Sequence, residues 1–298
     1  MCKNSLKVAL ILLFAILNVC KCYTPIVIWH GIGDTCCNNT ITGHLQKLLQ
    51  AYLPGSHVIS LQIGSTKEED LINSYNTHPD KQIRMACHII QSDPLLANGY
   101  NGIGFSQGSQ LMRGLAQRCG KPKMKNLITM AGQHQGVYGV PECNATAIPA
   151  CDAMRKLINN VIYLKALQEE LVPATYWHNP LNTNKYIKRS TYLADINNER
   201  NINEAYIENL QALDNFVMVR HGADEVVQPT ESSWFGFYKD GQSSEIETLP
   251  ESELYKSDRL GLKQMDKKGK LHFLLNDWKH AAFEWNWFRE NIVDTFLK

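Results

Sequence analysis

A serine flanked by two glycines is the strongest chemical signal in the chain. The run Gly104-Phe-Ser106-Gln-Gly108 follows the pattern G-x-S-x-G, in which a nucleophilic serine lies on a strained turn between a strand and a helix. The flanking residues must be small because this turn brings backbone segments close together. A strand-like run, 100–105, precedes Ser106, and a helix-like run, 107–118, follows it. This context predicts a nucleophile, and the simpler alternative is a glycine turn with an idle serine.

An activated serine needs an acid and a base, and this kind of elbow carries them in the order serine, acid, histidine. The predicted strand 216–219 leads into a loop that contains Asp224, which is our candidate acid. Asp214 precedes the strand and therefore lies at the wrong end. Glu225 is the second rival, and spacing alone does not separate it from Asp224.

The base should follow the next strand, 271–275, and His280 has that position. It would accept the Ser106 proton and then donate it to the leaving group. His272 lies inside the strand, which favours a packing role. His221 falls before the acid, in the wrong order for this fold.

Two backbone N–H groups are expected to stabilise the oxyanion that forms during acyl transfer. One should belong to Gln107, at the start of the helix after the nucleophile, where the helix dipole adds partial positive charge. The other should come from the glycine-containing loop after the first strand, where Ile32 is the candidate. His30 in the same loop precedes the serine, so a structural role is expected for it.

These residues require a scaffold of strands that end in loops. Apolar runs predict strands at 25–29, 58–61, 100–105, 126–131, 216–219 and 271–275. Helical periodicity predicts helices at 42–52, 82–91, 107–118 and a last helix with the apolar stripe Trp285, Phe288, Ile292 and Phe296. The alternation predicts an α/β chain with a mostly parallel, doubly wound sheet, and with the elbow it predicts the α/β-hydrolase fold.

The alternation is interrupted at 141–215. Helical patterns at 157–171 and 203–213 flank a polar and aromatic stretch that contains Pro173 and Pro180. We interpret 141–215 as a largely helical lid inserted into one hydrolase core, 23–140 and 216–298.

The first 22 residues have the pattern of a secretory signal peptide. Lys3 and Lys7 precede an apolar run, 8–19, that is too short to cross a bilayer comfortably, and cleavage is expected near Tyr23. An uncleaved anchor is the alternative. No other stretch is apolar enough to span a membrane, so we expect a lumenal or extracellular protein without a transmembrane segment.

Composition and cysteine usage agree with that compartment. The formal net charge is +1, so no basic field is present to hold nucleic acid. Removal of the signal peptide leaves six cysteines, which predicts three disulfides with fifteen possible connectivities. The chain has no C-x-x-C pair, and no histidine stands at metal-ligand spacing from these cysteines, so a metal site is not expected. Sequons begin at Asn38 and Asn144 and predict N-glycosylation.

The chain resembles the palmitoyl-protein thioesterase family over about residues 25–296. The motifs that carry the resemblance are long: His30-Gly-Ile-Gly-Asp34 with Cys36-Cys37, the serine elbow, Gly132-Gln-His-Gln-Gly136, Leu193-Ala-Asp-Ile-Asn197, Trp234-Phe-Gly-Phe-Tyr238 and Asp258-Arg-Leu-Gly-Leu262. The resemblance implies that the enzyme removes long-chain fatty acyl groups from cysteine thioesters of proteins or peptides, in lysosomal degradation. It supports Ser106, Asp224 and His280 as the triad, and Ile32 and Gln107 as oxyanion donors.

The resemblance also implies the disulfides Cys36–Cys37, Cys87–Cys119 and Cys143–Cys151. The chain departs from the family at Asn203-Glu-Ala205, where the hydroxyl residue of a sequon is missing. This departure affects the expected pattern of glycans and not the expected chemistry. The resemblance further implies delivery to the lysosomal lumen through the secretory pathway. A sorting receptor that binds N-glycans would be a partner, and secretion is the other expected destination.

The implied reaction needs an acyl-enzyme on Ser106 and no cofactor. The acyl chain would lie in an apolar groove between lid and core, with these candidate lining residues: Leu171, Val172, Val226 and Val227. Ordinary core packing explains each of these four equally well. Two other functions share the same residues: a lipase or carboxylesterase acting on oxygen esters, and a non-catalytic lumenal lipid-binding protein.

Overall fold

The computed structural model describes residues 23–141, 143 and 149–298. The predicted signal peptide 1–22 and the sequon asparagine Asn144 lie outside the described residues. Within these ranges, no helix has the length and apolar character needed to cross a membrane. The same ranges contain no group of three or more histidine, cysteine or acidic residues arranged to hold a metal ion.

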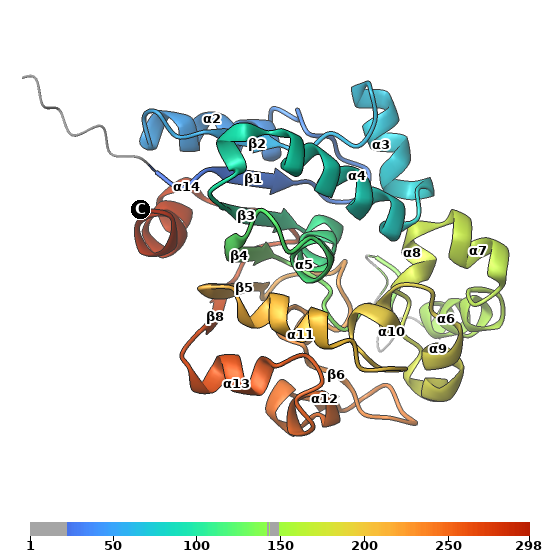
Figure 1. The fold of residues 1–298 in the computed structure, drawn as a ribbon. Helices are drawn as coiled ribbons and strands as arrows, with labels where there is room; N and C mark the ends of the chain where they lie inside the picture. Colours follow the sequence, from blue (N-terminus) through green and yellow to red (C-terminus); the bar gives the residue numbers. More distant parts are fainter. Residues whose placement is uncertain (1–22, 142, 144–148) are drawn as a thin grey trace, which may run out of the picture.

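Six parallel strands form the centre of the molecule (Figure 1). Their order in the sheet is β2-β1-β3-β4-β5-β8, and every neighbouring pair is parallel. Their bounds are β1 Ile26–Trp29, β2 Val58–Ser60, β3 Tyr100–Phe105, β4 Met124–Met130, β5 Asn215–His221 and β8 Leu271–Asn276. A separate antiparallel pair joins β6 (Phe237–Tyr238) to β7 (Ile246–Glu247). The structure confirms the predicted parallel sheet and the α/β-hydrolase fold.

Helices cover both faces of the sheet (Figure 1). One face carries α2 (Thr42–Tyr52), α14 (Trp285–Phe288) and the π-helical segment η5 (Arg289–Leu297). The other face carries α4 (Pro79–Ser92), α5 (Gln107–Arg118), α11 (Glu204–Gln211) and α13 (Leu262–Lys267). The remaining elements here are α3 Lys67–Asn76, α12 Glu253–Lys256 and the short 3-10 turns η1 Pro94–Leu96, η3 Thr230–Trp234 and η4 Leu249–Glu251.

The two-sided cover explains the continuous apolar run in the first strand. Successive side chains of a strand point to opposite faces. In β1, Val27 and Trp29 belong to the hydrophobic cluster beneath α4 and α5, whereas Ile26 and Ile28 belong to the cluster beneath α2. All four side chains are fully buried, as expected for a central strand of a parallel sheet.

The predicted lid region has a hydrophobic cluster of its own. The elements of this region are α6 Pro149–Val161, α7 Lys165–Glu170, α8 Val172–Thr175, η2 Pro180–Asn182, α9 Thr183–Arg189 and α10 Leu193–Ile196. The buried aromatic residues of this cluster include Tyr163, Trp177 and Tyr186. Because Phe237 joins this cluster, a segment beyond β5 also packs against the lid region.

Two features of the lid region differ from the sequence prediction. The expected helix 157–171 is wrong as one element, because α6 ends at Val161 and α7 begins at Lys165; the Gln168 amide satisfies the Ile162 carbonyl at the break (3.0 Å). Helix α11 lies within the predicted lid, yet its Leu210 belongs to the cluster beneath the core helices. The last helix of 141–215 therefore covers the sheet, and the lid boundary stays a prediction.

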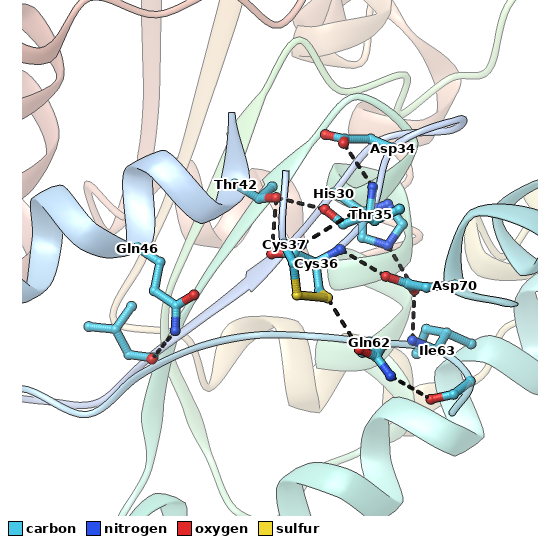
Figure 2. Close-up of a disulfide and its surroundings, with 12 residues drawn as sticks. His30, Asp34, Thr35, Cys36, Cys37, Thr42, Gln46, Gln62, Ile63 and Asp70 are labelled. Atoms are coloured by element: carbon cyan, nitrogen blue, oxygen red, sulfur yellow. Dashed lines mark hydrogen bonds and ion pairs between the residues drawn. A yellow bond between two sulfur atoms is a disulfide. The ribbon is translucent and has the colours of Figure 1, made fainter. Parts of the chain in front are cut away.

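Three disulfides join the described cysteines: Cys36 to Cys37, Cys87 to Cys119, and Cys143 to Cys151. These are the pairs that the family resemblance implies. The second links the C-terminal half of α4 to the residue after α5, and so fastens two helices of one sheet face. The first joins neighbouring residues in the loop after β1, close to buried polar groups (Figure 2).

We expect Glu199 to make the stability of the fold depend on pH. It borders a cavity of about 280 Å³, and burial raises its pKa to about 7, although the nearby Tyr186 hydroxyl and Arg259 guanidinium oppose the shift. The ordinary pKa of glutamate is 4.5, so the folded state holds more protons than the unfolded state between these two values. Its contribution to the unfolding free energy is thus fully present below about pH 4.5 and is lost as the pH rises through about 7.

We expect Glu199→Gln to remove this part of the pH dependence, which is on the order of 1–3 kcal/mol. Urea unfolding of the parent and the variant at about pH 5 and about pH 8 measures it. The parent should lose more stability than the variant between the two pH values. Equal losses in the two proteins would contradict the assignment.

Candidate active site

Ser106 stands on the strained turn that the sequence predicts. Its backbone has φ 51° and ψ −122°, a conformation that residues with side chains rarely adopt, and it directly precedes α5. A side chain at Gly104 would collide with the backbone of Gly108 and Ser109, and one at Gly108 would collide with the His30 carbonyl. The two glycines are therefore required by close backbone approach, and the turn presents Ser106 at the carboxyl end of β3.

The structure brings Ser106, His280 and Asp224 together. Nε2 of His280 lies 2.7 Å from Oγ of Ser106, and Nδ1 of His280 lies 2.8 Å from Oδ2 of Asp224. Because an ionised carboxylate only accepts hydrogen bonds, Nδ1 donates to Asp224 and Nε2 is left to accept from the serine hydroxyl. This is the tautomer that a general base needs.

The Asp224 carboxylate is held from both sides. It is 8% exposed, and its second oxygen, Oδ1, accepts the backbone N–H groups of Val226 (2.8 Å) and Val227 (3.0 Å). These two hydrogen bonds orient the carboxylate so that Oδ2 faces His280. An ionised Asp224 can stabilise the positive charge that forms on His280 when it accepts the serine proton.

The loop that carries Asp224 is bound to the loop that carries His280. Gly222 N–H donates to the Asn276 carbonyl (2.6 Å), and Ala223 N–H donates to the Trp278 carbonyl (3.1 Å). His221 adds a side-chain contact, since its Nδ1 lies 2.9 Å from the Lys279 carbonyl. Burial lowers the pKa of His221, so the neutral ring donates to the residue next to His280.

The rival residues lie in other environments. Asp214 is exposed and pairs with Lys123 on the surface (3.0 Å). Glu225 is exposed, and His272 pairs with the Asn215 side-chain oxygen (2.8 Å). His30 is 3% exposed and contacts Asp70 rather than the serine.

The two oxyanion candidates lie on segments that meet at the serine. Gln107 is the first residue of α5. Ile32 is in the loop after β1, and this loop passes so close to Ser106 that a side chain on Gly31 would lie 3.1 Å from Cβ of the serine. Their roles as N–H donors stay a prediction.

The four candidate acyl-groove residues fall into two groups. Val172 is 1% exposed within the lid cluster, and Leu171 is partly buried against it. Val227 is 2% exposed, and it borders a cavity of about 270 Å³ that also reaches Asp224. Val226 contributes its N–H to Asp224, as described above. Contact with an acyl chain stays a prediction for all four side chains.

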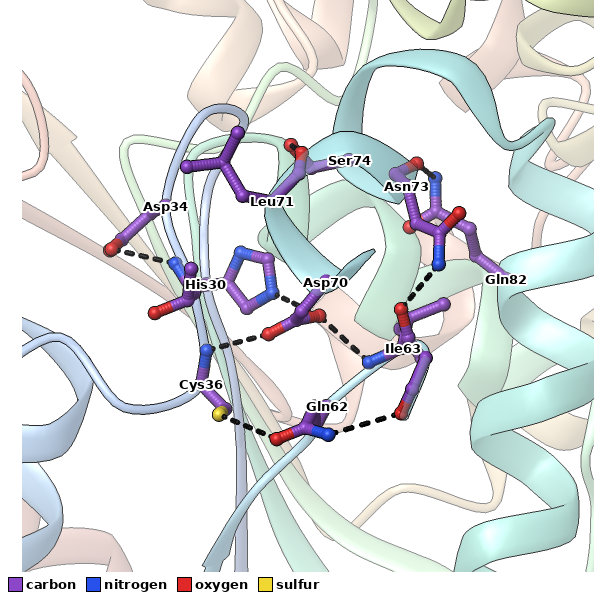
Figure 3. A network of polar contacts seen from close by, with 12 residues as sticks. His30, Asp34, Cys36, Gln62, Ile63, Asp70, Leu71, Asn73, Ser74 and Gln82 are labelled. Atoms are coloured by element: carbon purple, nitrogen blue, oxygen red, sulfur yellow. Dashed lines mark hydrogen bonds and ion pairs between the residues drawn. The ribbon is translucent and has the colours of Figure 1, made fainter. Parts of the chain in front are cut away.

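Helix α3 was missed from the sequence, and with it two buried polar residues that contact the loop after β1: Asp70 (Figure 3) and Ser74. A signal was present. Thr66 caps the helix by accepting the Glu69 N–H (3.1 Å), the S/T-x-x-E pattern of a capping box, and acidic residues fill the first turn. Nothing in this pattern indicates that the two polar side chains face inward.

Asn38, the sequon asparagine among the described residues, lies in the loop after the Cys36–Cys37 disulfide. It is half-buried, and its side-chain oxygen accepts from the Thr40 hydroxyl (2.7 Å) and the Thr40 N–H (2.9 Å). Glycosylation at this position stays a prediction.

Comparisons with known proteins place the chain in a family. Residues 25–280 match the family model described as palmitoyl protein thioesterase. The chain is 47% identical to palmitoyl-protein thioesterase 1 of Caenorhabditis elegans over 92% of this chain and 90% of that protein. It is 35% identical to palmitoyl-protein thioesterase 3 of Dictyostelium discoideum (91% and 90%) and 25% identical to the lysosomal thioesterase PPT2 of Homo sapiens (83% and 78%). The chain belongs to the palmitoyl-protein thioesterase family.

Proposed function

We propose that this protein is a serine thioesterase that removes palmitate and similar long-chain acyl groups from S-acylated cysteines of proteins or peptides. The observation that carries the proposal is the hydrogen-bonded series from Ser106 through His280 to Asp224, found on a strained elbow in a chain of this family. The reaction proceeds through an acyl-enzyme on Ser106.

In the first half of the reaction, Oγ of Ser106 attacks the thioester carbonyl while its proton passes to Nε2 of His280. The N–H groups of Ile32 and Gln107 hold the oxygen that becomes negatively charged, an interaction worth several kcal/mol. Collapse of the tetrahedral intermediate breaks the carbon–sulfur bond, and His280 protonates the departing cysteine sulfur. The palmitoyl group remains bound to Oγ of Ser106 as an oxygen ester.

In the second half, a water molecule attacks the ester and gives a proton to His280. The second tetrahedral intermediate uses the same two N–H groups. Its collapse releases the fatty acid and returns the proton to Ser106. Asp224 stays ionised throughout and keeps the imidazole in the required orientation.

The location that fits this reaction is the lysosomal lumen, reached through the secretory pathway. The predicted signal peptide, the three disulfides and the names of lysosomal relatives support it. N-glycans would provide the contact with a sorting receptor, and some of the protein could be secreted. Microscopy of the tagged protein tests this location: acidic vesicles are expected, and retention in the endoplasmic reticulum would contradict it.

Asp224→Asn is expected to lower kcat by about 10⁴-fold, because an amide in this place no longer selects the tautomer of His280 that can accept the serine proton. The matched control is Asp214→Asn, which changes an exposed carboxylate at the opposite end of β5, outside the triad. Steady-state hydrolysis of a palmitoyl thioester measures both variants. The control should retain parental kcat; an Asp224→Asn enzyme within about tenfold of the parent would exclude Asp224 as the acid.

Hydrolysis of a palmitoylated cysteine peptide by the purified protein tests the function itself. Release of the free thiol should be faster than release of alcohol from the matched palmitoyl-serine peptide. A faster reaction with the oxygen ester would reassign the protein as a lipase or carboxylesterase. Absence of turnover on both peptides by correctly folded protein would indicate lipid binding without catalysis.

A further inference from the structure

Helix α3 carries two buried polar residues that the reaction described above does not use. Asp70 is 0% exposed and Ser74 is 2% exposed, and their spacing places them on one face of the helix. A carboxylate is costly to bury unless it is hydrogen-bonded and paired. The partners of Asp70 therefore indicate what it holds in place.

Asp70 joins three segments of the chain (Figures 2 and 3). Its Oδ1 accepts the Ile63 N–H (2.7 Å) and lies 3.0 Å from Nε2 of His30; its Oδ2 accepts the Cys36 N–H (2.8 Å). These partners come from the loop after β2, the start of the loop after β1, and the disulfide-bearing part of that same loop.

His30 is bound through both ring nitrogens. Nε2 faces the Asp70 carboxylate, and Nδ1 lies 2.8 Å from the Gly31 carbonyl. Both partners only accept hydrogen bonds, so the ring satisfies both contacts in its doubly protonated form. Burial opposes that form, but the hydrogen bond and charge of Asp70 outweigh it, and the pKa of His30 is raised. His30 and Asp70 thus make a buried histidine–carboxylate contact two residues before Ile32.

Ser74, one turn further along α3, contacts Gly33, the residue after Ile32. Its Oγ accepts the Gly33 N–H (2.9 Å) and donates to the Leu71 carbonyl (2.6 Å). Gly33 has φ +72°, and a side chain there would collide with the Tyr75 hydroxyl. The loop is therefore shaped to lie directly on α3.

The same turn of α3 also contacts the second oxyanion candidate. The Ser74 carbonyl accepts a hydrogen bond from the Gln107 side-chain amide (2.8 Å). The oxygen of that amide accepts the Tyr176 hydroxyl (3.1 Å), which ties Gln107 to the lid region as well. One helix face thus contacts the residues on both sides of Ile32 and the side chain of Gln107.

We propose that Asp70 and Ser74 are positioning residues that hold the Ile32 and Gln107 N–H groups at the right separation to bind one oxyanion. This inference rests on the proposed function. Two N–H groups on separate segments stabilise an oxyanion only if both reach the same oxygen, and small displacements are expensive. The contacts of α3 set that separation without touching the substrate.

Ser74→Ala tests the proposal most cleanly, since it removes the acceptor for Gly33 and leaves the backbone carbonyl that binds Gln107. We expect kcat for a palmitoyl thioester to fall by roughly 10- to 100-fold, with KM changed by less than about threefold, since the loss falls on the transition state. Asn76→Ala, an exposed change on the same helix, should retain parental values. Asp70→Asn should lower kcat in the same way as Ser74→Ala.

A second readout separates positioning from a loss of folded protein. Hexadecyl trifluoromethyl ketone forms a tetrahedral adduct with Ser106 whose oxygen anion occupies the oxyanion hole, whereas palmitate, the product, lacks this geometry. Affinity for the ketone should weaken by the same factor as kcat in Ser74→Ala, while inhibition by palmitate should remain unchanged. Thermal unfolding measures the folded fraction of each variant.

The proposal is overturned if parental protein turns over the thioester and Ser74→Ala retains both kcat and ketone affinity within about twofold. It is equally overturned if kcat falls only in proportion to the folded fraction while ketone affinity is unchanged. Failure of the parental protein to hydrolyse the thioester is a different result and contradicts the proposed function instead.

Discussion

Replacement of Ser106 by alanine is expected to lower kcat for a palmitoyl thioester by roughly 10⁶-fold. In the proposed mechanism the hydroxyl oxygen forms the ester bond of the acyl-enzyme, and nothing in the alanine variant can form that bond. His280 and the two N–H groups remain, so a small residual rate from water attack is expected. The effect should appear in kcat, because Ser106 is 7% exposed and an alanine leaves the substrate-binding surface almost unchanged.

The control for this change is Ser92→Ala, at the exposed end of α4. A fluorophosphonate that reacts with activated serines should label the parent and Ser92→Ala and leave Ser106→Ala unlabelled. A turnover rate of Ser106→Ala equal to that of the parent would exclude Ser106 as the nucleophile. Alanine at φ 51° is no more strained than serine, so a folding defect is not the expected cause of lost activity.

His280→Ala is expected to lower kcat by a similar factor, roughly 10⁶-fold, because the members of a triad act as a unit. Without the imidazole, the Ser106 hydroxyl keeps its proton at neutral pH and the departing sulfur has no acid nearby. The double variant Ser106→Ala/His280→Ala should therefore be scarcely slower than either single variant. That strong non-additivity is the specific signature of a shared step.

His88→Ala provides the matched control, since His88 is an exposed histidine on α4. It should leave kcat and its pH profile unchanged. If the losses of the two single variants multiplied in the double variant, His280 and Ser106 would act in separate steps, and the base would have to be sought elsewhere.

The fold was largely predictable because its signals are local. Each predicted strand of the central sheet is present, and the helix predicted at 42–52 matches α2 in full. Regular alternation between apolar strands and amphipathic helices leaves few arrangements other than a doubly wound sheet. The lid region was harder. Its helices after α6 are short, and buried aromatic residues such as Tyr163 and Trp177 lie between helices, which gives a weak periodic signal.

The candidate triad was predictable because chain order and strand ends restrict it. The elbow identifies Ser106, and the loops after β5 and β8 bring Asp224 and His280 to the same edge of the sheet. The support around them was not predictable. His221 and Asp70 act through backbone carbonyl and N–H groups of residues distant in sequence, and no spacing rule encodes such contacts.

The groove for the acyl chain was least predictable. A side chain such as Val172 looks the same in sequence whether it lines a groove or fills a core, because both need an apolar surface. The structure places Val172 inside the lid cluster at 1% exposure.

The most direct test of the central claim is to trap the acyl-enzyme. Parental protein is mixed with a palmitoyl thioester, quenched in acid within the first turnover, and examined by intact-mass and peptide mass spectrometry. We predict a mass increase of one palmitoyl group, located on Ser106, that disappears once the substrate is consumed. Turnover with no acylated protein at any time, or acylation of a different residue, would contradict the proposed mechanism.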